Sequence, residues 1–544
     1  MNRIKKFLTR NWELSLLLVF ILIAVVLRFT NITSLNFFTF DQSRDALFVK
    51  RMIIDHQWRL LGTQTSLPGM YLPPFYYYTI APILWLSKLN PVSIDIYSAF
   101  IGVLTIPTIY FIANKIFGRP AGIFSSGLFA VSPLIVELTR RAWNPNTLPF
   151  FILITFYFIY MYFKEKKLKY FLLAFGFYGY CLSLHFGAWI LIPLFIFIWF
   201  FALIKDKLGI LGLLGAIGIL FFFVSPLFIF EIRHNFFLTQ QAKIFFFDGS
   251  HLGPKTGVNL LESFSTSLIA LFTILISGKI MVGYGAPLEF TGRLSDIFYL
   301  NKPISVVAQK PFSISFQWWG LGILALIIFF SLFKPNKYKL PLVLLWIWII
   351  WGVLISRMYG GSFFFFYYLF LFPAPILLFG LLGKIVFDSK KILIKTILSL
   401  AFALLIIFHL KYTTIHEKTW RDINDLKEVG KIIALNAPEN GTFNIATIQK
   451  DADRWDRNAV DYRYFTETFG GKRALDWYPQ DYQNAEILFV VDESGQSDPL
   501  SSKIMEISDF NPGQIIDQWT TGKNIVIYKI SKKEDIPKND IINQ

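Results

Sequence analysis

The feature that most constrains this chain is a series of apolar segments, each about as long as a membrane-spanning helix. A helix needs about 20 mostly apolar residues to cross the hydrocarbon core of a bilayer. The segments lie at 11–29, 96–114, 119–136, 148–163, 169–185, 187–204, 208–230, 312–333, 340–356, 364–386 and 391–410. The sequence therefore predicts a polytopic α-helical membrane protein with about 11 transmembrane helices.

The composition supports this prediction. The chain has 544 residues, of which 54% are hydrophobic, and it contains 60 Phe. Soluble globular proteins hold roughly 45–50% apolar residues. The first segment, Trp12–Phe29, is long enough to span and has no small-residue cleavage site after it, so we expect it to remain as the first helix. The single Cys181 excludes a disulfide framework.

The basic residues of the short loops indicate the orientation. Cytoplasmic loops of membrane proteins carry an excess of Lys and Arg. Alternate short loops are rich in these residues, whereas the opposite ones hold Arg140, Arg141 and Arg357 alone. We therefore expect a multi-pass protein of the cell (plasma) membrane, with its N-terminus in the cytoplasm and its C-terminal domain outside.

Two apolar segments fit poorly as spans. Pro74–Leu89 is short and contains Pro82, and Ser263–Val282 contains several hydroxyl residues and Lys279. We expect both to lie at the outer interface. The outer loops are then 31–95, 137–147 and the long loop 231–311.

The composition changes after residue 410. Residues 411–544 carry 17 Lys/Arg and 22 Asp/Glu, whereas residues 1–410 carry 35 and 14. Helix and strand patterns alternate, with strands expected at 443–448, 487–492 and 524–530. We predict a transmembrane domain at 1–410, a small extracytoplasmic α/β domain at 411–535 and a disordered tail at 536–544.

Asp41, Arg44 and Asp45 stand out in the first outer loop. If a helix begins here, positions 41 and 45 lie on one face. Carboxylates beside an arginine suit an acid–base site next to a bound phosphate. The alternative is structural, with Asp41 as a helix N-cap and a local ion pair.

Aromatic and amide residues form a second set of candidates for binding a sugar or an acceptor. Tyr71 and Tyr76 flank Pro73-Pro74 and could line a sugar site or belong to an interfacial aromatic belt. Trp143, Asn144 and Asn146 suit hydroxyl recognition by stacking and amide hydrogen bonds. An Asn-Pro turn that begins the next helix is the alternative.

Arg233 and Arg357 follow expected helices at their outer ends. Either could clamp a phosphate, or could anchor its helix at the interface. His234, next to Arg233, is a further candidate for sugar or acceptor binding. No His/Cys cluster has metal-site spacing, and no nucleotide-binding fingerprint occurs.

Taken together, these residues resemble the GT-C superfamily of membrane glycosyltransferases. More narrowly, the chain resembles family 39 and its relatives, which are the protein O-mannosyltransferases, the aminoarabinose transferase of lipid A and RgtA/B/C/D-like enzymes. The resemblance covers residues 10–410. It rests on the outer-loop Asp41, the interface helix Pro74–Leu89, the Lys115–Arg119 loop and the second outer loop before Pro149.

The resemblance implies that Asp41 is the catalytic aspartate. The family often has Asp-Glu with Arg at the third position after the Asp; Asp41 and Arg44 match, but Gln42 replaces the Glu. A role that needs the second acid would then pass to Asp45 or be absent. Asn144 and Asn146 replace an acid of the second loop, so metal-independent catalysis is favoured over a divalent cation, and we expect no cofactor.

The expected activity is that of a hexosyl- or pentosyltransferase. A sugar would pass from a polyprenyl-phosphate donor to a hydroxyl of a lipid, glycan or protein, with inversion and with Asp41 as general base. Arg44, Arg233 and Arg357 would bind the donor phosphate, and no nucleic acid is expected as a partner. A lipid-linked glycan flippase, a polymerase or ligase using pyrophosphate-linked donors, and a glycan receptor are the alternatives.

Overall fold

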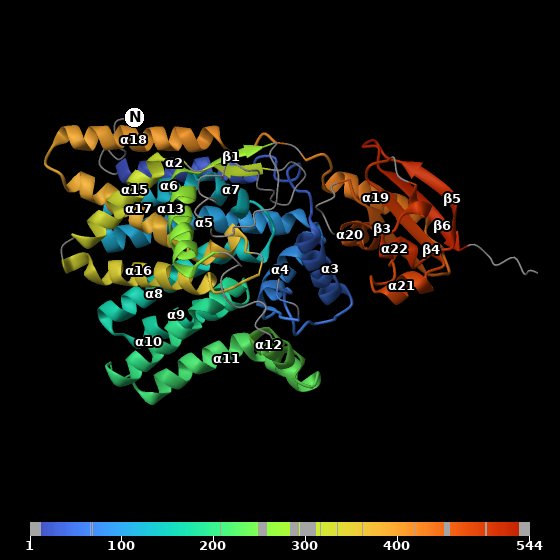
Figure 1. Ribbon diagram of the computed structural model, residues 1–544, viewed down its shortest axis with the longest axis horizontal. Helices are drawn as coiled ribbons and strands as arrows, with labels where there is room; N and C mark the ends of the chain where they lie inside the picture. The colour runs from blue at the N-terminus through green and yellow to red at the C-terminus, as the bar shows by residue number, and fades with distance from the viewer. Residues whose placement is uncertain are drawn as a thin grey trace, which may run out of the picture. The chain divides into compact units, whose positions relative to one another are not determined.

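A computed structural model describes most of the chain (Figure 1). The described residues are 12–65, 67, 69–206, 208–247, 258–282, 293, 312–315, 317–333, 336–361, 363–417, 419–450, 457–495 and 498–532. The long loop expected at 231–311 is thus described in part, and the tail expected at 536–544 lies outside the described residues.

The chain divides into two compact units, and each is taken by itself below. The first comprises Met1–Ile32, Met52–Val306 and Lys310–Glu417. The second comprises Thr33–Arg51, Val307–Gln309 and Lys418–Gln544.

The first unit is a bundle of apolar helices. Helices α5, α6 and α17 pack against one another, α8 packs against α9, and Figure 1 shows α16 and α18 running in nearly the same direction. The helices are α2 (Trp12–Phe29), α4 (Phe75–Leu86), α5 (Val92–Phe117), α6 (Arg119–Val131), α7 (Pro133–Thr139), α8 (Leu148–Glu165), α9 (Leu168–Leu182), α10 (Ile192–Ile204), α11 (Ile210–Arg233), α12 (Phe237–Phe247), α13 (Leu260–Ser277), α15 (Trp319–Leu332), α16 (Lys339–Ser356), α17 (Pro373–Asp388) and α18 (Ile392–Lys411).

Short elements connect these helices. Four short 3₁₀ helices and one antiparallel strand pair occur among the residues described for this unit. They are η1 (Asn144–Thr147), η2 (Phe186–Leu191), η3 (Asn336–Tyr338), η4 (Phe365–Phe370), β1 (Lys279–Val282) and β2 (Phe312–Ser315).

Within the described residues, 8 helices are long and apolar enough to cross a membrane, or 9 if the bent pair α6 and α7 forms one span. All of them except α13 coincide with segments predicted from the sequence. The other predicted segments form the shorter helices α9, α15 and α17, of 15, 14 and 16 residues. The chain is a multi-pass helical membrane protein, as expected, and the count of about 11 spans stays a prediction.

Helix α13 forms most of the apolar segment that was expected to lie at the outer interface or to dip into it, and this placement stays a prediction. It has 18 residues and enough apolar character to span. Its hydroxyl groups are hidden from lipid, because Ser263, Thr266 and Ser267 are buried and Ser277 Oγ donates to the Thr273 carbonyl at 2.7 Å. Helix α4 has 12 residues with Pro82 inside, which is too short to cross.

The break between α6 and α7 is stabilised by a buried cation. The two helices meet at 64°. Arg28 of α2 is fully buried and donates from Nη1 to the Ala130 carbonyl at 3.0 Å and from Nη2 to the Phe129 carbonyl at 3.2 Å. Its Nε donates to Thr139 Oγ1 at 2.9 Å. Arg28 thus serves carbonyls that the broken helix leaves without intrahelical donors.

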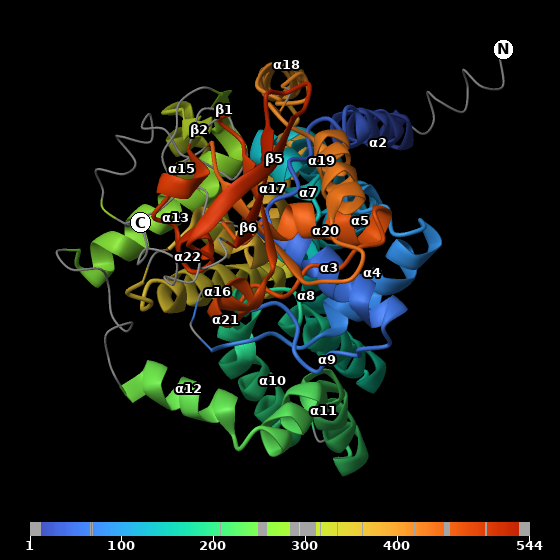
Figure 2. The same cartoon turned by 90° about the vertical axis from the view of Figure 1, so that its right-hand side faces the viewer.

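The second unit contains a four-stranded mixed sheet. The strand order is β3-β4-β6-β5, with β3 parallel to β4 and the other pairs antiparallel. Figure 2 shows β5 beside β6 at the edge of this sheet. The strands are β3 (Phe443–Ile448), β4 (Ile487–Asp492), β5 (Gly513–Thr520) and β6 (Val526–Lys532).

Helices cover both faces of this sheet. One buried core contains Ala446, Leu488 and Ile530 from the strands with Tyr482 and Ile507 from neighbouring helices. Strand residues of the opposite parity, such as Ile445 and Phe489, are also buried, so both faces of β3 and β4 are covered, whereas β5 is exposed along most of its length. The helices are α19 (Ile423–Asn436), α20 (Val460–Phe469), α21 (Pro479–Asn484) and α22 (Met505–Ser508).

The second unit also takes in a segment of the first outer loop. Thr33–Arg51 includes most of helix α3 (Phe40–Ile54), which carries the Asp41 motif. The predicted boundary at residue 410 follows the sequence alone and gives no hint of this association. The α/β character expected of the C-terminal residues is present, with strands at 443–448 and 487–492 as predicted.

Replacing Arg28 with Met should lower the free energy of unfolding by about 2–6 kcal/mol, because two buried carbonyls lose their donor at about 1–3 kcal/mol each. Thermal unfolding of the purified protein in detergent would measure this. Arg457→Met is the control, since that side chain is exposed. Equal melting temperatures for the two variants would contradict the role of Arg28.

Candidate active site

Helix α3 begins with a capped turn that holds Asp41 inside the helix. Gln42 Oε1 accepts a hydrogen bond from the backbone N–H of Thr39 at 2.9 Å, and the Ser43 N–H donates to the Thr39 carbonyl at 2.9 Å. Gln42 therefore forms the hydrogen bond to the N-cap backbone that a Glu or Gln at the third helical position makes in a capping box. Thr39, rather than Asp41, precedes the helix, so the Asp41 carboxylate is not needed as the N-cap.

Arg44 is held between the two carboxylates of the motif. Its Nη1 lies 2.9 Å from Asp41 Oδ1, while Nη2 and Nε lie 2.9 and 3.0 Å from Asp45 Oδ1. The side chains of Arg44 and Asp45 are 10% and 4% exposed, whereas that of Asp41 is 40% exposed. The three predicted residues thus come together, with Asp41 as the exposed member.

This arrangement separates the two carboxylates chemically. Asp41 can meet a ligand from solvent while Arg44 fixes one of its oxygens, which suits a group that accepts a proton in a defined direction. Asp45 is buried against Arg44, which suits a residue that orients the guanidinium. Arg44 already serves two carboxylates, so binding a phosphate there would require it to exchange one of these partners.

The second outer loop forms a buried turn in the first unit. Asn144 Nδ2 donates to the Leu184 carbonyl and Asn146 Nδ2 donates to the Arg141 carbonyl at 2.9 Å. The Oδ1 atoms of both side chains are buried and have no hydrogen-bond partner within the described part of the chain. Trp143 packs edge-on against Phe366 with ring centroids 4.7 Å apart. The two amides support the turn and also present acceptors that the turn does not use.

The tyrosine candidates lie in different surroundings. Tyr76 is on α4, 2% exposed and 6.3 Å from the Tyr77 ring, so it contributes to the core of the first unit. Tyr71 is half-buried and forms an antiparallel bridge with Gln64. Their proposed contact with a sugar stays a prediction.

Arg233 and His234 end helix α11 and are both exposed. His234 stacks on Phe230 at a centroid distance of 3.9 Å, and its Nδ1 lies 2.9 Å from the Phe230 carbonyl. The ring is thus held by its own helix, and Arg233 extends beside it as a cation accessible to an anionic ligand.

Arg357 lies in a buried polar cluster of the first unit. Its Nε donates to Ser263 Oγ of α13 at 2.6 Å, and its guanidinium lies 4.8 Å from the centre of the Phe363 ring. The Tyr368 hydroxyl interacts with Ser267 and Arg357, and the Thr266 hydroxyl is buried with no hydrogen-bond partner among the described residues. The sequence analysis missed these hydroxyls because they come from separate helices, although Ser263, Thr266 and Ser267 share one helical face.

Over the described residues, no group of three or more His, Cys, Asp or Glu side chains could hold a metal ion. The metal-independent mechanism favoured by the sequence remains a prediction.

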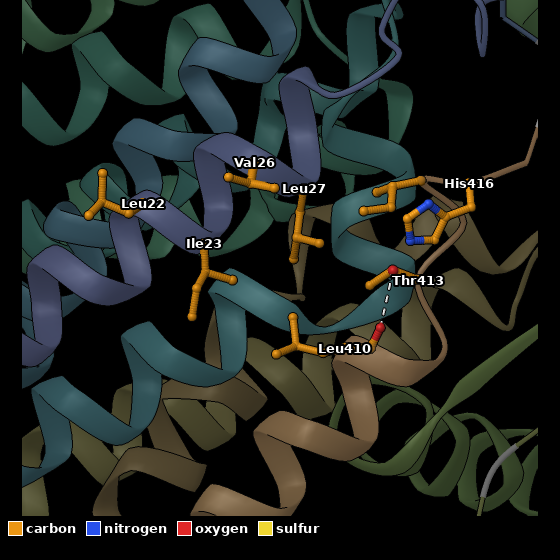
Figure 3. A pocket seen from close by; sticks show the side chains of 8 residues that line it. Leu22, Ile23, Val26, Leu27, Leu410, Thr413 and His416 are labelled. Atoms are coloured by element: carbon orange, nitrogen blue, oxygen red, sulfur yellow. Dashed lines mark hydrogen bonds between the residues drawn. The ribbon is translucent and has the colours of Figure 1, made fainter.

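An apolar groove lies elsewhere in the first unit (Figure 3). It has a volume of about 390 Å³ and is lined by α2 residues such as Leu22 and Val26 and by Leu410, Thr413 and His416. Figure 3 shows the Thr413 hydroxyl turned back to the Leu410 carbonyl, a 3.2 Å hydrogen bond. None of the predicted site residues lines this groove.

The fold is similar to that of solved membrane-protein structures along nearly the whole chain. The chain is similar to crystal structures of ArnT from Cupriavidus metallidurans. For ArnT bound to undecaprenyl phosphate the identity is 11%, the TM-score is 0.54, and 95% of this chain and 98% of that chain are covered. For the apo state the values are 13%, 0.55, 94% and 97%.

A shorter region carries a family signature. Residues 72–237 match the family model of the dolichyl-phosphate-mannose-protein mannosyltransferases. No curated protein sequence matches the chain. The fold similarity therefore covers nearly the whole chain, whereas the sequence signature covers the region from Leu72 to Phe237, which does not include Asp41.

The two aspartates should differ in their effect on stability. Asp45→Asn should lower the free energy of unfolding by about 1.5–3 kcal/mol, because a buried hydrogen bond between charged groups is weakened. Asp41→Asn should cost about 1 kcal/mol or less, since its carboxylate is exposed. Thermal unfolding in detergent would compare them, and a larger loss in Asp41→Asn would show that the exposed carboxylate is the structural one.

Proposed function

We propose that the protein is a glycosyltransferase that moves a sugar from a polyprenyl-phosphate carrier to a hydroxyl group of a lipid, glycan or protein. The reaction would take place at the outer face of the cell membrane, with the N-terminus in the cytoplasm and the C-terminal domain outside. The sugar that is transferred would be a hexose or a pentose.

Two comparisons support this proposal. The fold is similar along 95% of the chain to that of an ArnT that binds undecaprenyl phosphate. Residues 72–237 match a family that uses dolichyl-phosphate mannose. Both names point to a sugar carrier that is a lipid phosphate.

The observation that carries the proposal is the Asp41–Arg44 pair on α3. The carboxylate is 40% exposed and one of its oxygens is held 2.9 Å from Arg44 Nη1. This group is the exposed carboxylate of the predicted motif, whereas Asp45 is buried. Asp41 is therefore our choice for the general base.

The proposed step is a single displacement. Asp41 accepts the proton of the acceptor hydroxyl as the oxygen attacks the anomeric carbon of the sugar. The bond from that carbon to the phosphate oxygen breaks, and the electron pair stays on the phosphate. Because attack and departure occur on opposite faces, the anomeric configuration inverts. Proton acceptance of this kind contributes about 10²–10⁴-fold to the rate.

The leaving phosphate needs positive charge. Arg44, Arg233 and Arg357 remain our candidates for binding it, since guanidinium groups match phosphate oxygens bidentately. The exposed Arg233 is the simplest of the three to test, because its replacement uncovers no buried carboxylate or hydroxyl partner.

Asp41→Asn should reduce sugar transfer by about 10²–10⁴-fold, because the amide cannot accept the acceptor proton. The measurement is transfer from a synthetic polyprenyl-phosphate sugar by purified protein, together with the melting temperature. Asp517→Asn, an exposed carboxylate on the edge strand β5, is the control and should keep full activity. Full activity in Asp41→Asn would remove Asp41 as the base.

Arg233→Gln should weaken donor binding by about 10–100-fold, which corresponds to the loss of a hydrogen bond to a charged group of about 1.5–3 kcal/mol. Binding of polyprenyl phosphate would be measured directly, with Lys243→Gln on the neighbouring helix α12 as an exposed control. The same affinity in both variants would assign Arg233 to interface anchoring instead.

A further inference from the structure

We propose that the C-terminal residues of the second unit position the Asp41 helix for catalysis, and that Glu467 is the central positioning residue. The inference rests on the proposed function, because it concerns the placement of the proposed base. It assigns a role to a domain whose role the sequence leaves open.

The distal part of α3 is held by acidic side chains of the C-terminal residues. Glu467 Oε1 lies 3.6 Å from Lys50 Nζ and 3.5 Å from Arg51 Nη2. Arg473 Nε lies 3.3 Å from the same oxygen. The side chains of Glu467, Lys50 and Arg51 are 6%, 9% and 7% exposed, so these charges interact with little screening by water.

A second carboxylate reinforces this contact. Asp476 Oδ1 lies 2.9 Å from Arg51 Nη1, and its side chain is 42% exposed. The stacked rings of Phe48 and Trp477 add an apolar contact one turn earlier, with centroids 6.1 Å apart. Both the charged and the apolar side of this end of α3 therefore face residues from 467–477.

The residues just before α3 also pack against the C-terminal residues. Phe38 has a backbone φ of +57°, which is uncommon for a bulky residue and costs on the order of 1–3 kcal/mol. Its N–H donates to Asn36 Oδ1 at 2.7 Å, and its ring packs between Tyr464 and Phe465 at 5.4 Å from each. The strained conformation is thus maintained by packing against α20.

A buried ion cluster supports this packing. Arg421 lies 3.2 Å from Glu493 and forms a salt bridge with Asp461, and its guanidinium lies 4.1 Å from the centre of the Phe37 ring. Burial alone would lower the pKa of Arg421, but the charges of Glu493 and Asp461 outweigh it and hold the pKa above its ordinary value. Arg421 therefore stays charged under Phe37.

Asp41 lies between these two attachments, three residues after Phe38 and nine before Lys50. A helix fixed at both ends can hold an exposed carboxylate in one direction. Removing the charge of Glu467 would leave Lys50 and Arg51 buried with less compensation, and they would move toward water. The resulting shift of α3 would displace Asp41, and a displacement of about 1 Å can cost about 100-fold in rate.

The test compares Glu467→Gln with Glu467→Asp and with Glu428→Gln, an exposed carboxylate on α19. For each variant, kcat for transfer from a synthetic polyprenyl-phosphate sugar, the affinity for polyprenyl phosphate and the melting temperature are measured. Glu467→Gln should lower kcat by about 10–100-fold, with a smaller change in donor affinity because the phosphate candidate Arg44 lies on the same helix as Asp41. Glu467→Asp should restore part of the rate, and Glu428→Gln should match the wild type.

The decisive comparison repeats Glu467→Gln in the Asp41→Asn background. If Glu467 acts through Asp41, the second change should add less than about twofold to the loss, because coupled residues are not additive. A merely structural role would lower the rate by the same factor in both backgrounds and would overturn the inference. Wild-type kcat in folded Glu467→Gln would also overturn it.

Asp476→Asn keeps the inference testable if Glu467→Gln does not fold. The Asp476 side chain is 42% exposed, and Arg51 keeps the Glu467 carboxylate as a partner when Asp476 is replaced. Asp476→Asn should lower kcat in the same sense by a smaller factor, with donor affinity changing less than kcat, and an unchanged kcat would count against the inference. Activity retained in Asp41→Asn itself would instead reject the proposed base, which separates the two failures.

Discussion

The attachment of helix α3 to the C-terminal residues is the constraint on which the candidate site depends. Phe38 adopts a left-handed backbone conformation against Tyr464 and Phe465, and Glu467 faces Lys50 and Arg51. Between these attachments, Gln42 caps the helix so that Asp41 is not used for capping. Asp41 consequently remains exposed while Arg44 and Asp45 are buried, and this difference separates the proposed base from its support.

The membrane unit obeys a second constraint, that polar groups without water must find partners in the protein. Arg28 meets it by donating to the carbonyls where α6 breaks, and Ser277 meets it by bonding within α13. Arg357 is bonded to Ser263, and the Thr266 hydroxyl on the same helix as Ser263 has no partner among the described residues. A buried hydroxyl without a hydrogen bond lowers the stability of the folded protein, and a bound water or ligand group commonly supplies the missing bond.

The sequence predicted the fold class because apolar segments and strand patterns are local signals. Helices α5, α11 and α18 and strands β3 and β4 follow directly from them. Helix α13 was expected at the interface because of its hydroxyl residues and Lys279, and no local pattern indicated that Ser263, Thr266 and Ser267 would be buried. The grouping of Asp41, Arg44 and Asp45 was predictable from i, i+3 and i, i+4 spacing. The contact of Glu467 with α3 was not predictable, because it joins residues more than 400 positions apart in the chain. Local sequence patterns carry no information on contacts between such distant residues.

The central claim is that a sugar leaves a lipid monophosphate in one inverting displacement. The most direct measurement offers purified protein matched monophosphate-linked and pyrophosphate-linked sugars and determines the anomeric configuration of any product by NMR. The account predicts transfer from the monophosphate-linked donor with inverted configuration. Transfer from the pyrophosphate-linked donor alone, or a product of retained configuration, would contradict it.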